Sequence, residues 1–153
     1  MPSGVPGSPG DYAASIGSTG ADYPISLTNG IQLPPNGALE AFNGVPFKRI
    51  TDGLSNTILV GDKHVPLGHF ADFPWDCSIY DGHNPVCNTR AAGPGYPLVD
   101  SMRDMGWKFG SYHSGICQFA FCDGSVHILK NSISENVLGL LANKSDGQVI
   151  PDY

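Results

Sequence analysis

Residues 116–130 read Ile116-Cys-Gln-Phe-Ala-Phe-Cys-Asp-Gly-Ser-Val-His-Ile-Leu-Lys130, and this stretch decides the fold. It contains two runs of β-branched and aromatic residues, separated by Asp123 and Gly124. An Asp-Gly pair between two such runs predicts a β-hairpin, because both central residues of a type I′ turn need a positive φ. The sequence therefore predicts an antiparallel strand pair near its C-terminal end.

The turn type also predicts which residues face each other across the hairpin. A two-residue turn at 123–124 places Phe121 opposite Val126 and Phe119 opposite Ile128. Since side chains alternate between the two faces of a strand, one face should be apolar and lie against the core. This core face consists of Cys117, Phe119, Phe121, Val126 and Ile128. The opposite, wetter face consists of Gln118, Ala120 and His127.

The same alternation bears on the four cysteines. Cys117 and Cys122 should point to opposite faces and lie about 16 Å apart. A disulfide needs Cα atoms within about 7 Å, so these two should not pair with each other. Cys77 and Cys87 are close enough in sequence for a disulfide to close a short loop. Simple buried thiols are the alternative.

Further elements flank the hairpin. We expect one short strand in residues 11–16 and one buried strand in residues 57–60. A helix should follow the hairpin, since Ser132 and Glu135 have the spacing of a capping box with Ser132 as the N-cap. Its apolar stripe would consist of Ile133, Val137, Leu140 and Leu141.

Length and composition set the class. A chain of 153 residues suits one domain, and we expect residues 1–10 to be a linker or cloning remnant and residues 11–153 to form a single domain. Its 20 Gly and 13 Pro residues predict many turns and long loops, including an insertion at residues 64–106. The expected class is α+β, strand-dominated, with a small antiparallel sheet, the C-terminal β-hairpin and one short helix.

Charge and hydropathy exclude some partners. A formal net charge of −6 argues against a nucleic-acid partner, whose phosphates this surface would repel. The sequence has no apolar run long enough to span a membrane and no signal-peptide pattern. We expect the natural N-terminus to have been removed.

Two motifs resemble a known family. His113 is followed after nine residues by Asp123 and Gly124, which resembles the H-x9-DG signature of the DUF1559 family of prepilin-like proteins, abundant in planctomycete bacteria. Residues 50–61, Ile-Thr-Asp-Gly-Leu-Ser-Asn-Thr-Ile-Leu-Val-Gly, are similar to the second conserved block of that family. Residues 141–150 resemble its usual ending. The resemblance covers about residues 11–150.

The resemblance implies a fold and a function. The fold would be a pilin-like globular domain that lacks the N-terminal helix typical of the family. The function would be that of a pseudopilin-like subunit of a pilus or type II secretion-like system, with other pilin-like subunits or the secretion apparatus as partners. The protein would be extracytoplasmic, meaning periplasmic, on the cell surface or secreted. It would meet the membrane only through the missing prepilin-like helix.

Motif residues are assigned structural roles. His113 and Asp123 could in principle form a base and its orienting carboxylate. However, Asp123 is already explained as a turn residue, and we expect His113 to hydrogen-bond nearby backbone at the start of the hairpin. No nucleophile motif accompanies them, so we expect no enzymatic activity and no catalytic residue. The structural motif residues are His113, Asp123, Gly124, Asp52, Gly53, Ser55 and Asn56.

The insertion carries the remaining candidates. Asp76 and Asp81 are weak candidate calcium ligands, because no EF-hand spacing is present and a solvated acidic loop is the simpler interpretation. We expect no other metal and no cofactor. Trp75, Tyr80 and Trp107 could contact a ligand such as a glycan, which would make the chain a surface carbohydrate-binding or adhesion module. Packing of these rings as anchors of the long loop is the favoured interpretation.

Overall fold

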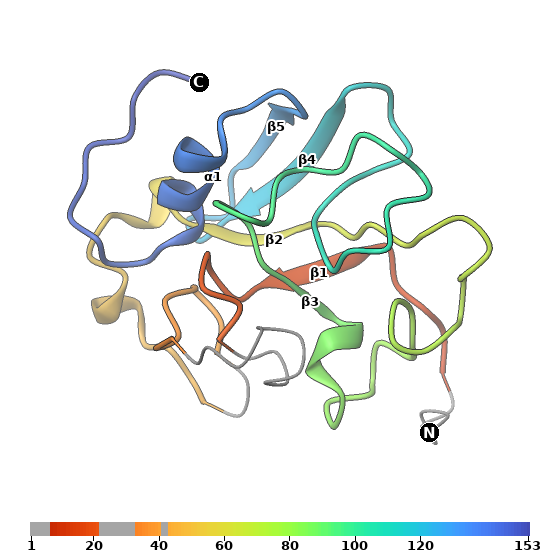
Figure 1. Cartoon of the computed structure of the whole chain (residues 1–153). Coiled ribbons are helices and arrows are strands. Elements are labelled where there is room, and N and C mark those ends of the chain that lie inside the picture. The colour runs from red at the N-terminus through yellow and green to blue at the C-terminus, as the bar shows by residue number, and fades with distance from the viewer. Residues whose placement is uncertain (1–6, 22–32, 41–42) are drawn as a thin grey trace.

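The computed structural model describes residues 7–21, 33–40 and 43–153. In this part of the chain, five strands form one sheet in the order β3-β1-β2-β4-β5 (Figure 1). The strands are β1 (Tyr12–Ser15), β2 (Ile58–Asp62), β3 (Thr89–Arg90), β4 (Ile116–Phe121) and β5 (Val126–Lys130). One α-helix, α1 (Glu135–Ala142), and three 3-10 turns, Phe47–Arg49, Leu54–Asn56 and Pro85–Cys87, complete the elements of these ranges. The expected α+β class, dominated by strands, is confirmed. The linker assigned to residues 1–10 lies mostly outside the described residues.

The sheet is mixed rather than antiparallel throughout. β1–β2, β2–β4 and β4–β5 are antiparallel, whereas β1 and β3 are parallel. A parallel neighbour needs a long crossover connection. More than seventy residues, including β2, separate β1 from β3, so the chain has ample length to place β3 parallel beside β1. The expected small antiparallel sheet is thus formed by β1, β2, β4 and β5, and β3 adds one parallel neighbour at its edge.

The β4–β5 hairpin exists, but its register differs by one residue from the predicted register. The Phe121 amide donates to the Ser125 carbonyl at 2.9 Å, so the loop has three residues, and Gly124 in it has φ +87°. Three-residue hairpin loops of this kind place glycine in the left-handed conformation. Phe119 consequently faces His127, and Ala120 faces Val126.

This shift changes the face of every β5 side chain, as a one-residue slip must. Val126 and Ile128, predicted in the core, are 68% and 61% exposed. Leu129 is buried in their place, and the His127 ring lies 4.3 Å from the Phe121 ring. The assignment holds for β4, where alternate residues are buried: Cys117, Phe119 and Phe121.

Helix α1 packs on the same face of the sheet and begins later than predicted. Its N-cap is Ser134, whose side chain accepts from the Val137 amide, not Ser132. The reason is local: the Ile133 amide donates to the Lys130 carbonyl, so these residues turn the chain out of β5 before the helix can start. The buried core beneath α1 consists of Ala13, Ile58, Ala92, Leu98, Phe109, Cys117, Phe119, Phe121, Leu129, Leu138, Leu141 and Ala142. None of the helices in the described ranges has the length and apolar character needed to cross a membrane.

Candidate functional site

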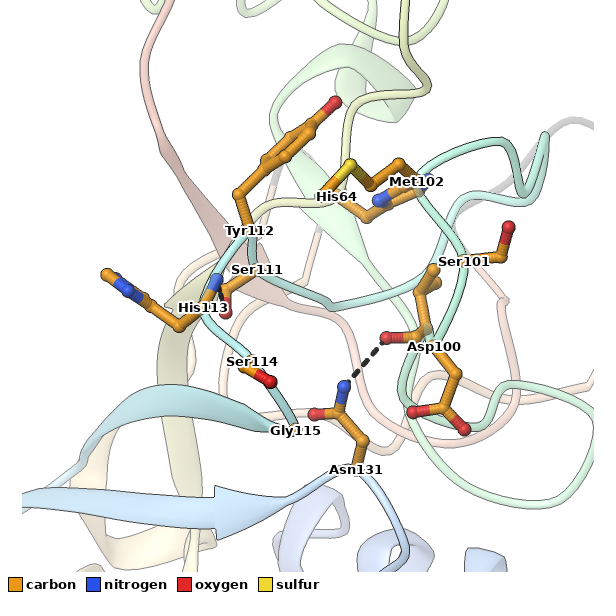
Figure 2. Close-up of a pocket in the computed structure, with 11 residues that line it drawn as sticks. His64, Asp100, Ser101, Met102, Ser111, Tyr112, His113, Ser114, Gly115 and Asn131 are labelled. Atoms are coloured by element: carbon orange, nitrogen blue, oxygen red, sulfur yellow. Dashed lines mark hydrogen bonds between the residues drawn. The ribbon is translucent and has the colours of Figure 1, made fainter.

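A small pocket of about 260 Å³ lies beside the loop that carries His113 (Figure 2). Its lining comes from two loops and the end of β5, and includes His64, Asp100, Ser111, Tyr112 and Asn131. His64 is buried, and its Nε2 donates to the Asp104 carbonyl at 2.8 Å. Burial lowers the pKa of His64, because it disfavours the imidazolium. The histidine in the pocket wall is thus already hydrogen-bonded to the backbone, and its burial favours the neutral form.

His113 itself makes little use of this pocket. Figure 2 shows its imidazole pointing away from Asp100 and Asn131. The residue is exposed, and its ring forms no hydrogen bond to any residue that the structure describes. The expected bond from the ring to nearby backbone is absent.

Ser111 performs the role assigned to His113. Its hydroxyl donates to the Ile116 carbonyl at 2.6 Å and accepts from the His113 amide at 3.0 Å. These two bonds fix the path of the chain into β4. Nothing in the sequence distinguishes Ser111, because serines are common in loops of every kind.

His113 and Asp123 do not form a base and carboxylate pair. They lie at opposite ends of the six-residue β4, which spans about 20 Å. Asp123 instead accepts from the Ser125 amide at 2.9 Å and the Ser125 hydroxyl at 2.6 Å. These bonds, the side-chain one first, lower the pKa of Asp123. The Ser125 hydroxyl oxygen also lies 3.0 Å from His127 Nε2, so Asp123 is linked through Ser125 to His127 and not to His113.

The second motif block lies next to the hairpin turn. The Asp123 amide donates to the Leu54 carbonyl at 3.1 Å, and the Cys122 amide donates to the Thr57 carbonyl at 2.9 Å. Gly53 has φ +102°, a conformation that favours glycine, and its carbonyl accepts from the Asn56 amide and the Thr57 hydroxyl. The two motif blocks are therefore in direct contact.

Asp52 in the same block holds the C-terminal segment. Its carboxylate accepts from the amides of Asp146, at 2.6 Å, and Gly147, at 2.9 Å. The Asn56 side chain donates to the Asp52 carbonyl at 2.9 Å, while Ser55 is exposed in the same turn. Lys144 is buried nearby and pairs with Glu40 at 2.9 Å. Residues 52–57 thus connect the hairpin turn to the chain after α1.

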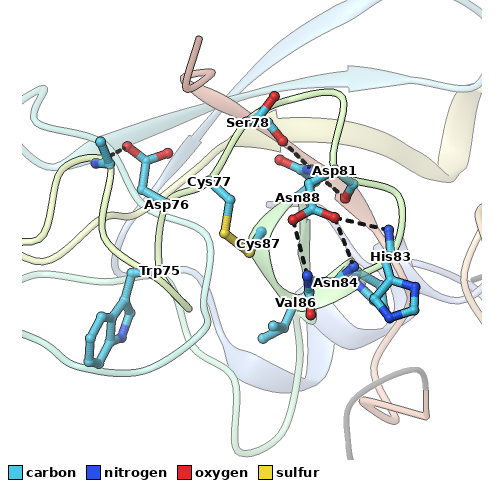
Figure 3. Close-up of a disulfide and its surroundings, with 12 residues drawn as sticks. Trp75, Asp76, Cys77, Ser78, Asp81, His83, Asn84, Val86, Cys87 and Asn88 are labelled. Carbon is cyan, nitrogen blue, oxygen red and sulfur yellow. Dashed lines mark hydrogen bonds between the residues drawn. A yellow bond between two sulfur atoms is a disulfide. The ribbon is translucent and has the colours of Figure 1, made fainter. Parts of the chain in front are cut away.

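The insertion is closed by a disulfide between Cys77 and Cys87, whose Cα atoms lie 5.4 Å apart (Figure 3). Both cysteines are buried. Cys117 and Cys122 are free and buried, and burial raises the pKa of Cys122 to about 11 and that of Cys117 higher still. These two thiols are therefore poor nucleophiles at neutral pH.

Neither candidate calcium ligand has a carboxylate available. Asp81 accepts from the amides of His83 and Asn84 and from the Asn84 side chain, all within 3.3 Å (Figure 3). These bonds, led by that of the Asn84 side chain, lower the pKa of Asp81. Asp76 accepts from Lys63 Nζ at 2.6 Å and the Ala71 amide at 2.8 Å. Among the described residues there is no cluster of three side chains suited to a metal ion.

Buried cations anchor the insertion to the sheet. Arg90 in β3 is fully buried and donates to four carbonyls, those of Val86, Thr89, His64 and Trp75. Lys63 is buried in its pair with Asp76, and burial lowers the pKa of its ammonium while Asp76 opposes this shift. Sequence analysis missed Arg90, because nothing in a single sequence distinguishes a buried arginine from a solvated one.

The three aromatic candidates do not form one surface. Trp75 and Trp107 stack with ring centroids 6.4 Å apart and planes 8° apart, and Trp75 donates from Nε1 to the Met105 carbonyl at 2.9 Å. The His69 ring lies 4.4 Å from Trp75. Tyr80 is 73% exposed, and no ring contact joins it to this stack. Both tryptophans are partly buried, as anchors of a long loop should be.

Together these contacts define a disulfide-bonded α+β domain with a mixed sheet and a long anchored insertion. The family described as "Protein of unknown function (DUF1559)" matches residues 6–136, and the chain belongs to this family. No curated protein and no solved structure matches the chain.

Proposed function

We propose that this protein is a structural or assembly protein and not an enzyme, a pseudopilin-like subunit of a pilus or type II secretion-like system. One observation carries the proposal: residues from each of the two sequence motifs, although not His113, hold chain segments to one another. Asp52 binds the backbone at 146–147, and the 54–57 turn binds the hairpin turn at 122–123. Such residues specify a shape, which is what a subunit of an assembly must present.

The proposed location is outside the cytoplasm. The Cys77–Cys87 disulfide supports it, because disulfides form and persist in oxidising compartments. The motif resemblance to prepilin-like proteins supports the partners, which would be other pilin-like subunits or the secretion apparatus. In this proposal an N-terminal prepilin-like helix anchors the full-length protein.

Cell fractionation and negative-stain microscopy of cells that produce the full-length protein test the proposal. We expect the protein in membrane or surface fractions, and antibody label on filaments or short surface assemblies. A product that is purely cytosolic and monomeric would overturn the proposal.

A surface carbohydrate-binding module is the second candidate function. The stacked Trp75 and Trp107 rings favour it, because partly exposed aromatic rings are common contacts for sugars. A glycan array comparing the wild type with Trp75→Ala tests this candidate, with Tyr80→Ala as a control for loss of an exposed ring elsewhere. Binding that Trp75→Ala alone abolishes supports the module. An absence of glycan binding by the wild type removes it.

A further inference from the structure

Strand β5 is an open edge of the sheet. It pairs with β4 on one side and is the last strand in the order. Because the Phe121–Ser125 pair is hydrogen-bonded, the alternation of antiparallel ladders directs the amides and carbonyls of Val126, Ile128 and Lys130 away from β4. Among the described residues, the only partner of these groups is the Ile133 amide, which donates to the Lys130 carbonyl.

Most side chains of this edge do not protect it, and its one charged residue, Lys130, lies at the end of the strand. Val126 and Ile128 are more than half exposed, and Val126–Lys130 contains no proline and no acidic residue. Sheets usually guard their edges with short strands, charges, prolines or bulges. The opposite edge follows this rule, since β3 has two residues and the chain continues there into a bridge between Ala91 and Lys108. β5 is thus the edge suited to pair with another strand.

We infer that β5 is a self-association surface, which pairs antiparallel with β5 of a second copy of this chain. The register follows from the strand itself. Val126, Ile128 and Lys130 are the residues whose backbone amides and carbonyls point away from β4. A two-fold axis through Ile128 pairs all three with residues of the same set in the other copy. Ile128 then faces Ile128, and Val126 faces Lys130. Shifting the pairing by two residues in either direction would place Lys130 or Val126 of one copy opposite a residue that lies outside β5.

Charge makes this pairing compatible with two copies of the same acidic protein. Two chains of formal net charge −6 repel each other over most of their surfaces. The paired strands carry no acidic residue, and the two-fold axis keeps the lysines apart by placing each opposite a valine. It also sets each Lys130 at the end of the partner strand that leads into the turn carrying Asp123.

A groove beside the edge adds apolar surface to the same contact. It measures about 340 Å³ and lies between β5, the start of α1 and the C-terminal residues. Its walls contain the apolar Ile128, Ile133, Val137 and Tyr153, together with the acidic Asp152. Antiparallel edge pairing keeps both helices on the same face of the joined sheet. The grooves of the two copies then face each other across the axis, where their apolar walls can be buried together.

The inference stands on the sheet edge alone and does not rest on the proposed function. Analytical ultracentrifugation of the 153-residue chain tests it, at up to about 100 µM, where a contact with a micromolar Kd is well populated. We expect a dimer that Ile128→Lys weakens about tenfold or more, because it removes two isoleucines and sets two ammonium groups opposite each other. Val149→Lys is the matched control, since Val149 is 90% exposed and lies outside β5.

Unfolding curves of Ile128→Lys, followed by circular dichroism, should match those of the wild type, because the side chain is exposed. A wild type that stays monomeric throughout this concentration range overturns the inference. A dimer whose Kd does not change in Ile128→Lys overturns it as well. Either result leaves the proposed location and assembly role untouched, because those are tested in cells.

A cysteine at the axis tests the register. Ile128→Cys should form an intermolecular disulfide in mild oxidant faster than Val149→Cys, as seen on non-reducing gels. The native free cysteines, Cys117 and Cys122, are buried and contribute little background. Equal rates for the two variants would overturn the two-fold register.

Discussion

Replacing Asp52 with alanine should destabilise the protein although Asp52 is not one of its buried core residues. Its carboxylate accepts two hydrogen bonds, from the amides of Asp146 at 2.6 Å and Gly147 at 2.9 Å. Both amides follow α1 in the chain, so the substitution releases the C-terminal segment from the 52–57 turn. The backbone contacts of Asp52 with Lys144 and Asn56 remain in the variant.

The size of the effect follows from these two bonds. A hydrogen bond to a charged group contributes about 1.5–3 kcal/mol when buried, but Asp52 is partly exposed, so we take about 1 kcal/mol for each. The expected loss is about 2 kcal/mol in the free energy of unfolding. For a protein of this size, that corresponds to a decrease in Tm of about 4–8 °C.

Urea unfolding and differential scanning calorimetry measure the loss directly. Asp52→Asn keeps one acceptor oxygen and should lose about half as much. Ser55→Ala is the matched control, because Ser55 is exposed in the same turn and should change the stability by less than about 0.5 kcal/mol. An Asp52→Ala protein that melts within about 1 °C of the wild type would contradict the view that the motif is architectural.

Three further outcomes are expected. His113→Ala should leave Tm nearly unchanged, whereas Ser111→Ala should cost about 1–2 kcal/mol by removing two hydrogen bonds; calorimetry showing the reverse order would contradict the assignment. Replacing both Cys77 and Cys87 with serine should lower the free energy of unfolding by about 2–3 kcal/mol on the chain-entropy model, and dithiothreitol should then have no further effect on urea unfolding of the variant. Burial lowers the pKa of His64 in the folded state, so below about pH 6.5 the unfolded chain binds a proton at His64 that the folded protein does not, and stability should decline as the pH falls. Urea midpoints measured between about pH 5 and 8 should depend less on pH in His64→Gln than in the wild type. An equal pH dependence in the two proteins would refute the coupling.

Local chemistry was enough to predict the secondary structure near the C-terminus. The Asp123-Gly124 pair and the β-prone runs beside it predicted the hairpin, and the burial pattern of β4 agrees with the alternation read from the sequence. The length of the turn was not determined in the same way. A glycine with positive φ suits both a two-residue and a three-residue loop, and the difference reverses the faces of Val126 and Ile128.

The candidate site illustrates the same division. The sequence identified Asp52 and Gly53 as a block with a structural role, and both contribute to the turn that contacts residues 122–123 and 146–147. It did not identify Ser111 or Arg90, whose importance comes from carbonyls that other segments bring to them. The predicted helix N-cap, Ser132, is wrong for a related reason. Ser132 has the right spacing from Glu135, but the Ile133 amide donates to the Lys130 carbonyl at the end of β5, so the helix starts later.

By itself, the sequence determined the strand-dominated class, the hairpin, the helix and the family of this chain, because these depend on residues near one another and on the order of motifs. Only the tertiary structure decided which face of β5 is exposed, which side chain holds the start of β4, and that the 52–57 turn binds the chain after α1. Those outcomes depend on a single residue of register and on contacts between segments some ninety residues apart, as between Asp52 and Asp146. Local propensities carry no information about such contacts.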